Sequence, residues 1–347
     1  MRRIWMAVAI LGVSPLAVAQ QPKVINAQLH TEPASAGLSA AVDQLKHSNG
    51  PAWMGYVVPA IPGSHFSMCS NEDSSRQEGC CGVYRLENEN NNYRSSDGDY
   101  ATETSIAVLA RIDNGAIDKI RFIGSSCQLD GGGLPFTWLT EVKPDDSLTW
   151  LSSLVTVDDK RHTDQALAAI AMHETPKATA VLEGFASPAN PLWLREKSAF
   201  WLGAGRGHEG YIALKKMMGD PDPEFRKKLS FDLFVSKDPA GVDDLIGMAK
   251  SDKDVGVREQ AIFWVGQKAG RKAIAMLKDT VENDPEVGVK KKAVFALSQL
   301  PKDEAVPELL HVAQTNASAT VRKEAIFWLG QTHDPRALDY FEQILSK

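Results

Sequence analysis

The sequence predicts an α+β N-terminal domain followed by an all-α solenoid of six two-helix repeats. The solenoid is predicted by a pattern that recurs in the second half, as in Val257–Gln267 (VREQAIFWVGQ) and Val321–Gln331 (VRKEAIFWLGQ). A basic residue of this pattern recurs in steps of 31, 32, 32 and 32 residues, at Arg195, Arg226, Arg258, Lys290 and Arg322. A period of this length is typical of stacked helical units. The α+β domain is predicted by a β-hairpin centred on Asn114-Gly115.

The chain begins with a segment typical of a cleavable secretory signal, residues 1–19. Arg2 and Arg3 form a charged start, Ile4–Val13 is an apolar run, and small residues lead to a cleavage site after Ala19. Because the apolar run is too short to span a bilayer, we expect no membrane insertion after cleavage. We therefore expect a periplasmic or secreted bacterial protein.

The charge distribution argues against nucleic acid and anionic membranes as partners. Loss of Arg2 and Arg3 with the signal changes the formal net charge from −6 to −8. Residues 20–158 hold 9 basic and 17 acidic residues, whereas residues 159–347 hold 27 of each. Binding to phosphates or anionic lipids depends on a positive surface, which neither part is predicted to provide.

Residues 20–158 are predicted to form the small α+β domain. We expect Gln20–Ala36 to be an unstructured leader, and residues 37–47 to form a helix because their apolar residues have helical spacing. Trp53–Ile61 is apolar and has prolines at both ends, which favours an edge strand.

The hairpin is the clearest local signal in this domain. Ser105–Asp113 and Ala116–Gly124 flank the Asn114-Gly115 turn, whose residues tolerate the positive φ angles of a two-residue turn. Counting outward from the turn places Arg111 opposite Asp118, where their charges attract. We therefore expect an antiparallel sheet.

All four cysteines lie in this domain: Cys69, Cys80, Cys81 and Cys127. An even number of cysteines in an exported protein favours disulfide bonds. Neighbouring cysteines rarely bond to each other, which leaves Cys69–Cys80 with Cys81–Cys127, or Cys69–Cys81 with Cys80–Cys127. Each bond would stabilise the domain by about 2–4 kcal/mol. A metal site that includes His65 is the alternative, although the spacing matches no zinc pattern.

A second register shows that each repeat of the solenoid, residues 159–347, has two helices. Apolar residues recur in steps of 32, 31, 32, 32 and 32, at Leu182, Leu214, Leu245, Leu277, Leu309 and Phe341. In each unit we expect an outer helix with the Phe-Trp pattern and an inner helix with this apolar residue. The first unit, Thr163–Phe185, lacks the arginine and the aromatic residues, as a terminal unit can.

The repeats resemble HEAT repeats of the short bacterial type found in phycobilisome-lyase-like proteins. The resemblance rests on Arg258, Ala261, Ile262, Val265 and Gly266, followed by a short turn and a second amphipathic helix, and it covers about 185 residues. It implies a curved right-handed stack that mainly holds other proteins. Some members of the family act in chromophore attachment or in di-iron hydroxylation, and the hydroxylases use several His-Glu pairs. This chain has one such pair, His208-Glu209, so that activity is not implied. The front domain resembles no characterised family.

The phenylalanine of each unit is predicted to point away from the core. At about 100° per residue, Val257, Ala261 and Val265 share one side of their helix and Phe263 lies opposite. The corresponding residues form a predicted partner-binding ridge: Phe200, Phe231, Phe263, Phe295 and Phe327. Either each ring fills the groove between adjacent outer helices, or the row is partly exposed and docks a partner or the front domain. We expect three tryptophans to face the core: Trp201, Trp264 and Trp328.

The sequence carries no motif typical of catalysis, cofactor binding or metal binding. Four histidines fall at different phases of the repeat: His173, His208, His311 and His333. We therefore expect an exported scaffold that binds a protein partner in the cell envelope, with no cofactor and no enzymatic activity. The alternative is an accessory enzyme, or a protein that binds a metal or small ligand, with its site in the N-terminal domain or in the groove between the domains.

Overall fold

The computed structural model describes residues 23–47, 50–61, 83–88, 104–125, 127–268 and 270–346. The chain divides into two compact units between Val142 and Lys143, with residues 119–121 grouped with the second unit. Helix α2 (Pro144–Ser153), which falls in the predicted front domain, therefore groups with the helices that follow it. The predicted signal, residues 1–19, lies outside the described residues.

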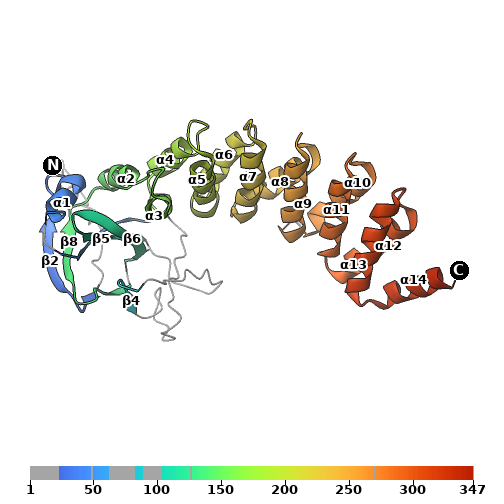
Figure 1. The fold of residues 1–347 in the computed structure, drawn as a ribbon, viewed down its shortest axis with the longest axis horizontal. Coiled ribbons are helices and arrows are strands. Elements are labelled where there is room, and N and C mark those ends of the chain that lie inside the picture. The colour runs from blue at the N-terminus through green and yellow to red at the C-terminus, as the bar shows by residue number, and fades with distance from the viewer. Residues whose placement is uncertain are drawn as a thin grey trace, which may run out of the picture. The chain divides into compact units, whose positions relative to one another are not determined.

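The first unit contains a five-stranded sheet in the order β2-β8-β3-β5-β6 (Figure 1). Its strands are β2 (Gln28–Pro33), β3 (Ala52–Pro59), β5 (Ser105–Asp113), β6 (Ala116–Gly124) and β8 (Pro135–Thr140). A smaller sheet consists of β1 (Val24–Ile25), β7 (Gln128–Asp130) and β4 (Val83–Arg85). Strand β3 is antiparallel to β5, whereas β8 is parallel to both β2 and β3. The sheet is therefore mixed, and the expectation of an antiparallel sheet holds only for part of it.

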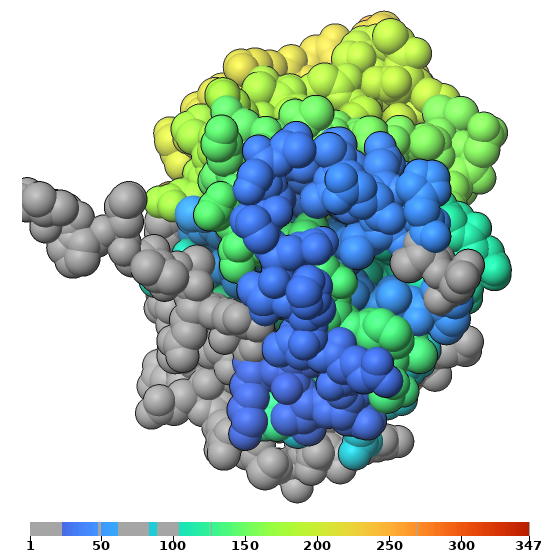
Figure 2. Space-filling model, turned by 90° about the vertical axis from the view of Figure 1, so that its left-hand side faces the viewer, coloured from blue at the N-terminus to red at the C-terminus, as the bar shows by residue number. Residues whose placement is uncertain are grey.

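Two expectations about single strands were wrong. Strand β2 lies inside the segment expected to be an unstructured leader, and it pairs with β8 along its whole length. Its side chains are mostly exposed, and Figure 2 shows its part of the chain (blue) on the surface. An exposed edge strand needs no apolar pattern, so no periodicity in the sequence predicts it. Strand β3 is not an edge strand, because β5 and β8 flank it and Pro51 and Pro59 stand at its ends.

The predicted hairpin and the predicted first helix are confirmed. Strands β5 and β6 have the predicted bounds, and the turn residues Asn114 and Gly115 have φ angles of 50° and 76°. Arg111 donates a hydrogen bond to Asp118 at 2.8 Å, as the counted register requires. Helix α1 (Leu38–Leu45) lies within residues 37–47.

The described part of the second unit contains six helix pairs after α2, as predicted. The first helices are α3 (Lys160–Ala171), α5 (Leu192–Gly205), α7 (Pro223–Val235), α9 (Val255–Lys268), α11 (Val287–Ser298) and α13 (Ala319–Thr332). The second helices are α4 (Lys177–Phe185), α6 (Gly207–Met217), α8 (Ala240–Ser251), α10 (Ile274–Asn283), α12 (Lys302–Thr315) and α14 (Pro335–Leu345), with the short 3₁₀ helix η1 (Gly270–Ala273) before α10. Figure 1 shows the pairs following one another along the unit.

The two sequence registers mark the core between the paired helices. Five leucines of the second register are fully buried: Leu182, Leu214, Leu245, Leu277 and Leu309. On the first helices, Val257, Ala261 and Val265 are likewise fully buried. The solenoid therefore buries one apolar side of each helix, and each unit depends on its neighbours for a continuous core.

The first helices of neighbouring units pack more closely on each other than the second helices do. Glycines permit the close approach: a Cβ atom on Gly203 would lie 2.5 Å from the backbone oxygen of Asp232, and one on Gly266 would lie 2.9 Å from Ala296. In a curved stack the closely packed helices lie on the inner side of the curve. The Phe-Trp helices therefore line the concave side of this unit, and the expectation that they are the outer helices was wrong.

Candidate functional site

The concave side carries a row of aromatic rings that runs from α5 to α13, which we call the aromatic row. Its members are Phe200, Trp201, Phe231, Phe234, Phe263, Trp264, Phe295, Phe327 and Trp328. Phe200 stacks on Phe231 with ring centroids 6.1 Å apart, and Phe263 stacks on Phe295 with centroids 5.9 Å apart. Trp264 joins these two stacks, because its ring lies 4.9 Å from Phe231 and 4.8 Å from Phe263.

The predicted ridge is part of this row, and its rings are partly exposed. Phe327 is 55% exposed, and the other four phenylalanines of the ridge are half-buried. Each of those four leans on a ring of a neighbouring helix, so groove filling and partial exposure occur together. The three tryptophans were expected in the core, but they are half-buried and belong to the row. Trp264, for example, lies 4.7 Å from Phe234 on the preceding first helix.

Asp232 occupies the tryptophan position in α7, where α5 comes closest to that helix. Its side chain is fully buried, and neither carboxylate oxygen has a hydrogen-bond partner among the described residues. The ammonium group of Lys228 is 3.9 Å away. Burial raises the pKa of Asp232 to about 8, with Lys228 acting against the shift and Glu196 adding to it. Asp232 is therefore mostly protonated at neutral pH.

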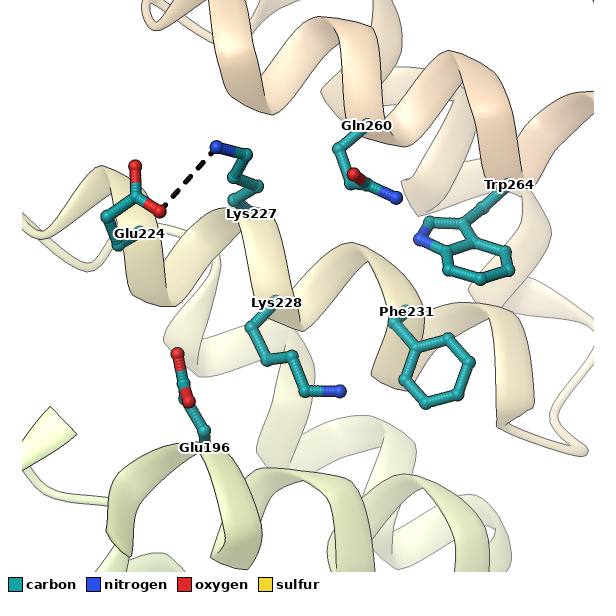
Figure 3. Close-up of a pocket in the computed structure, with 7 residues that line it drawn as sticks. All are labelled: Glu196, Glu224, Lys227, Lys228, Phe231, Gln260 and Trp264. Carbon is teal, nitrogen blue, oxygen red and sulfur yellow. Dashed lines mark ion pairs between the residues drawn. The ribbon is translucent and has the colours of Figure 1, made fainter. Parts of the chain in front are cut away.

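A hollow of about 460 Å³ lies beside the aromatic row where α5, α7 and α9 meet, and we call it the charged hollow (Figure 3). It is lined by Glu196, Glu224, Lys227, Lys228, Phe231, Gln260 and Trp264. Lys228 lies over Phe231 with its nitrogen 4.2 Å from the ring centroid. Lys227 pairs with Glu224 at 3.5 Å. Figure 3 shows these side chains converging from the three helices.

Burial affects two groups in the charged hollow. The indole nitrogen of Trp264 is buried and has no hydrogen-bond partner among the described residues. Burial raises the pKa of Glu196, with the nearby Lys228 acting against the shift. The hollow thus combines a ring surface, two ammonium groups and two carboxylates, which suits recognition of a polar side chain that also covers the rings.

The recurring arginine ties adjoining units together. Arg226 donates two hydrogen bonds to Asp252, both of 2.8 Å, and Arg258 donates to Asp284 at 3.0 and 3.2 Å. Each aspartate precedes the first helix of the next unit. Arg322 donates to backbone carbonyl oxygens at the start of its own unit. These arginines are used internally and do not contribute to the charged hollow.

The histidines are not brought together. His173 is buried, and its ring nitrogens lie 2.8 Å from the carbonyl oxygen of Ala169 and 2.9 Å from the hydroxyl of Ser147. Burial lowers the pKa of His173 to about 4. His208 pairs with Asp238 at 2.5 Å. Within the described ranges, no three or more His, Cys, Asp or Glu side chains are placed to hold a metal ion.

Part of the predicted chemistry falls on residues that the structure does not describe. Cys69, Cys80, Cys81 and His65 lie outside the described residues, and Cys127 is buried. The proposed disulfide pairs and the alternative metal site therefore stay predictions. Over the described part of the chain, the helices are too short or too polar to cross a membrane.

Sequence reasoning found the ridge but missed the charged hollow. The signal for the hollow is a difference between units that lie 64 residues apart. Gln260 and Trp264 correspond to Glu324 and Trp328, so a glutamine stands where the later unit has a glutamate. Which rings contact each other, and where space remains between them, can be known only from the positions of the helices.

The comparisons with known proteins concern the repeats. A family model for HEAT repeats matches residues 274–347, which supports the HEAT-repeat resemblance of this part of the chain. No curated protein matches the chain. A solved structure of the CpcE–CpcF complex of phycocyanin lyase from Nostoc sp. PCC7120 is similar, with 21% identity, 44% of this chain and 99% of that chain covered, and a TM-score of 0.34.

Two further solved structures are similar. Human deoxyhypusine hydroxylase in complex with glycerol has 19% identity, with 56% of this chain and 77% of that chain covered and a TM-score of 0.31. Kap121p has 12% identity, with 53% of this chain and 25% of that chain covered and a TM-score of 0.33.

Proposed function

We propose that this protein is an exported, non-catalytic scaffold that binds a partner protein in the cell envelope through the concave side of its HEAT-like repeats. The observation that carries the proposal is the aromatic row. Five first helices contribute partly exposed rings to one side of the unit, and side chains of this kind are enriched at protein interfaces.

The structure of the repeats supports this role. A row of helices offers a long surface of the size that specific protein complexes bury, without any need for a deep pocket. Charged side chains border the rings, as in the charged hollow, and such a polar rim adds specificity. The resemblance to HEAT repeats points in the same direction.

The test is capture of partners from the cell envelope by the mature full-length protein, compared with matched variants. The row variant combines Phe263→Ser with Phe327→Ser, and the control is Ile212→Ser. Ile212 is an apolar side chain that is 40% exposed on the second helix α6, away from the aromatic row. We expect the row variant to lose at least about tenfold in affinity for a captured partner, as loss of central aromatic contacts does. Equal capture by wild type and row variant contradicts the proposal.

Export and disulfide formation form a separate part of the proposal. Cys127 supports it, because it is buried and is not a free thiol in the structure. Thiol counting on the denatured mature protein should find no free thiols, and cell fractionation should find the protein outside the cytoplasm with residues 1–19 removed. Free thiols together with stoichiometric bound metal would instead favour the accessory-enzyme alternative.

A further inference from the structure

The charged hollow can be compared with the equivalent place two units later in the same chain. Shifting its α7 and α9 residues by 64 positions leads to the corresponding place between α11 and α13. Lys227, Lys228, Phe231 and Trp264 correspond there to Lys291, Lys292, Phe295 and Trp328. The aromatic pair has almost the same spacing, with ring centroids 4.9 Å apart in the hollow and 5.0 Å apart in the later place.

The two places differ at several positions: Glu224 and Asp232 correspond to Gly288 and Ala296, and Gln260 corresponds to Glu324. The last of these differences changes the partner of the tryptophan. In the later place, Glu324 accepts a hydrogen bond from the indole nitrogen of Trp328 at 3.0 Å and pairs with Lys291 at 3.0 Å. In the charged hollow this glutamate is replaced by the neutral Gln260. Among the described residues, the indole nitrogen of Trp264 is left without a hydrogen-bond partner.

The lysines of the charged hollow are only loosely paired, so an incoming carboxylate can interact with them. Lys227 makes a loose pair with Glu224, at 3.5 Å and with the glutamate side chain 64% exposed. Lys228 lies over the ring of Phe231, 3.9 Å from the buried Asp232, and also interacts electrostatically with Glu196. Glu196 acts against an incoming anion, but it rises from α5 on the side of the hollow away from Gln260 and Trp264 (Figure 3).

We propose that the charged hollow binds a carboxylate side chain of the partner protein, which takes the place that Glu324 occupies two units later. This inference rests on the proposed function and names the chemistry of one contact within it. The carboxylate accepts a hydrogen bond from Trp264 and pairs with Lys227, and its aliphatic part covers Phe231. Figure 3 shows the end of the Gln260 side chain next to the indole nitrogen, so this side chain rotates aside when the ligand enters.

The test uses the indole N–H resonances of the ¹⁵N-labelled full-length protein, with Trp264 and Trp328 assigned by substitution with Phe. The probe is the acetylated and amidated tripeptide Ala-Glu-Ala, and its control is the same peptide with Gln in place of Glu. We expect the Glu peptide to shift the Trp264 resonance with a dissociation constant on the order of 1–10 mM, as for a ligand with few contacts. The Trp328 resonance should stay unchanged.

Two reciprocal variants add a measurement that needs no peptide, the position of the Trp264 resonance itself. Gln260→Glu should move the Trp264 resonance toward the position of Trp328 and abolish its response to the peptide. Glu324→Gln should make Trp328 respond to the Glu peptide. The inference is overturned if the Gln peptide acts like the Glu peptide, if neither peptide shifts Trp264, or if Gln260→Glu leaves the Trp264 resonance in place.

The partner-capture assay separates this inference from the proposed function. If the inference is right, Gln260→Glu should weaken capture about as much as Lys227→Gln does. If both variants capture the partner like wild type while the row variant does not, the hollow is not a contact and the scaffold role stands. If the row variant also captures normally, the scaffold role fails, and the peptide titration alone decides whether the hollow binds carboxylates.

Discussion

The buried Asp232 should make the stability of the protein fall as the pH rises, and Asp232→Asn should remove this effect. Burial raises the pKa of this carboxyl from 3.8 to about 8. Above pH 3.8 the unfolded chain therefore releases a proton that the folded chain keeps, so the free energy of unfolding decreases with pH until about pH 8. One pKa unit corresponds to about 1.4 kcal/mol, so the loss between pH 5 and pH 8 is about 4 kcal/mol.

The assay is urea unfolding at pH 5 and pH 8, followed by far-UV circular dichroism, for wild type, Asp232→Asn and the control Asp339→Asn. Asp339 is exposed on α14, so its variant should follow wild type at both values of pH. The stability of Asp232→Asn should change with pH by about 4 kcal/mol less than that of wild type. Parallel changes in wild type and Asp232→Asn would show that the carboxylate finds a partner or water, and would refute the reasoning from burial.

Three further predictions concern the packing of the first helices, each checked by urea unfolding at constant pH. Phe327→Ser should lower the free energy of unfolding by less than about 1 kcal/mol because the ring is 55% exposed. Phe263→Ser should lower it by about 1–2 kcal/mol because the stack on Phe295 is lost, and equal losses in the two variants would contradict the difference in burial. Gly203→Ala should destabilise the protein by about 1–3 kcal/mol because its Cβ would lie 2.5 Å from a backbone oxygen of α7. Gly330→Ala lies in open space on α13 and should stabilise the protein by about 0.5–1 kcal/mol, so destabilisation by both variants would contradict this reasoning. Arg226→Ala should cost about 3–5 kcal/mol because it removes the ion pair of Asp252, whose side chain is only 8% exposed and keeps only a backbone hydrogen bond from Asp254; a loss below about 1 kcal/mol would mean that the pair adds little to the stack.

The aromatic row shows which features helical periodicity can predict and which it cannot. Placing Phe263 opposite Val257 and Val265 depended only on the angle between successive residues, and the structure agrees with it. The same calculation placed Trp264 in the core, but its ring lies against Phe231 and Phe234 on the preceding first helix. The angle gives the direction of a side chain from its own helix, whereas the burial of a large ring depends on which neighbour it reaches.

The front unit shows the opposite case, in which local patterns misled. Pro51 and Pro59 were read as signs of an edge strand, but prolines at the ends of a strand leave the ladder between them intact, and β3 has a neighbour on each side. Strand β2 has a polar sequence because its side chains are exposed. Its partner β8 lies more than 100 residues further along the chain, and no local pattern encodes a pairing over that distance.

The sequence by itself determined the six helix pairs and the hairpin at Asn114-Gly115, because each follows from a short period or a local turn. Only the tertiary structure decided which helices line the concave side, since this depends on how closely neighbouring units approach at Gly203 and Gly266. It also decided that, within the described ranges, the indole nitrogen of Trp264 lacks a hydrogen-bond partner while that of Trp328 has one. That difference appears only when residues 64 positions apart are compared in space, because the free energy of a buried polar group depends on what surrounds it.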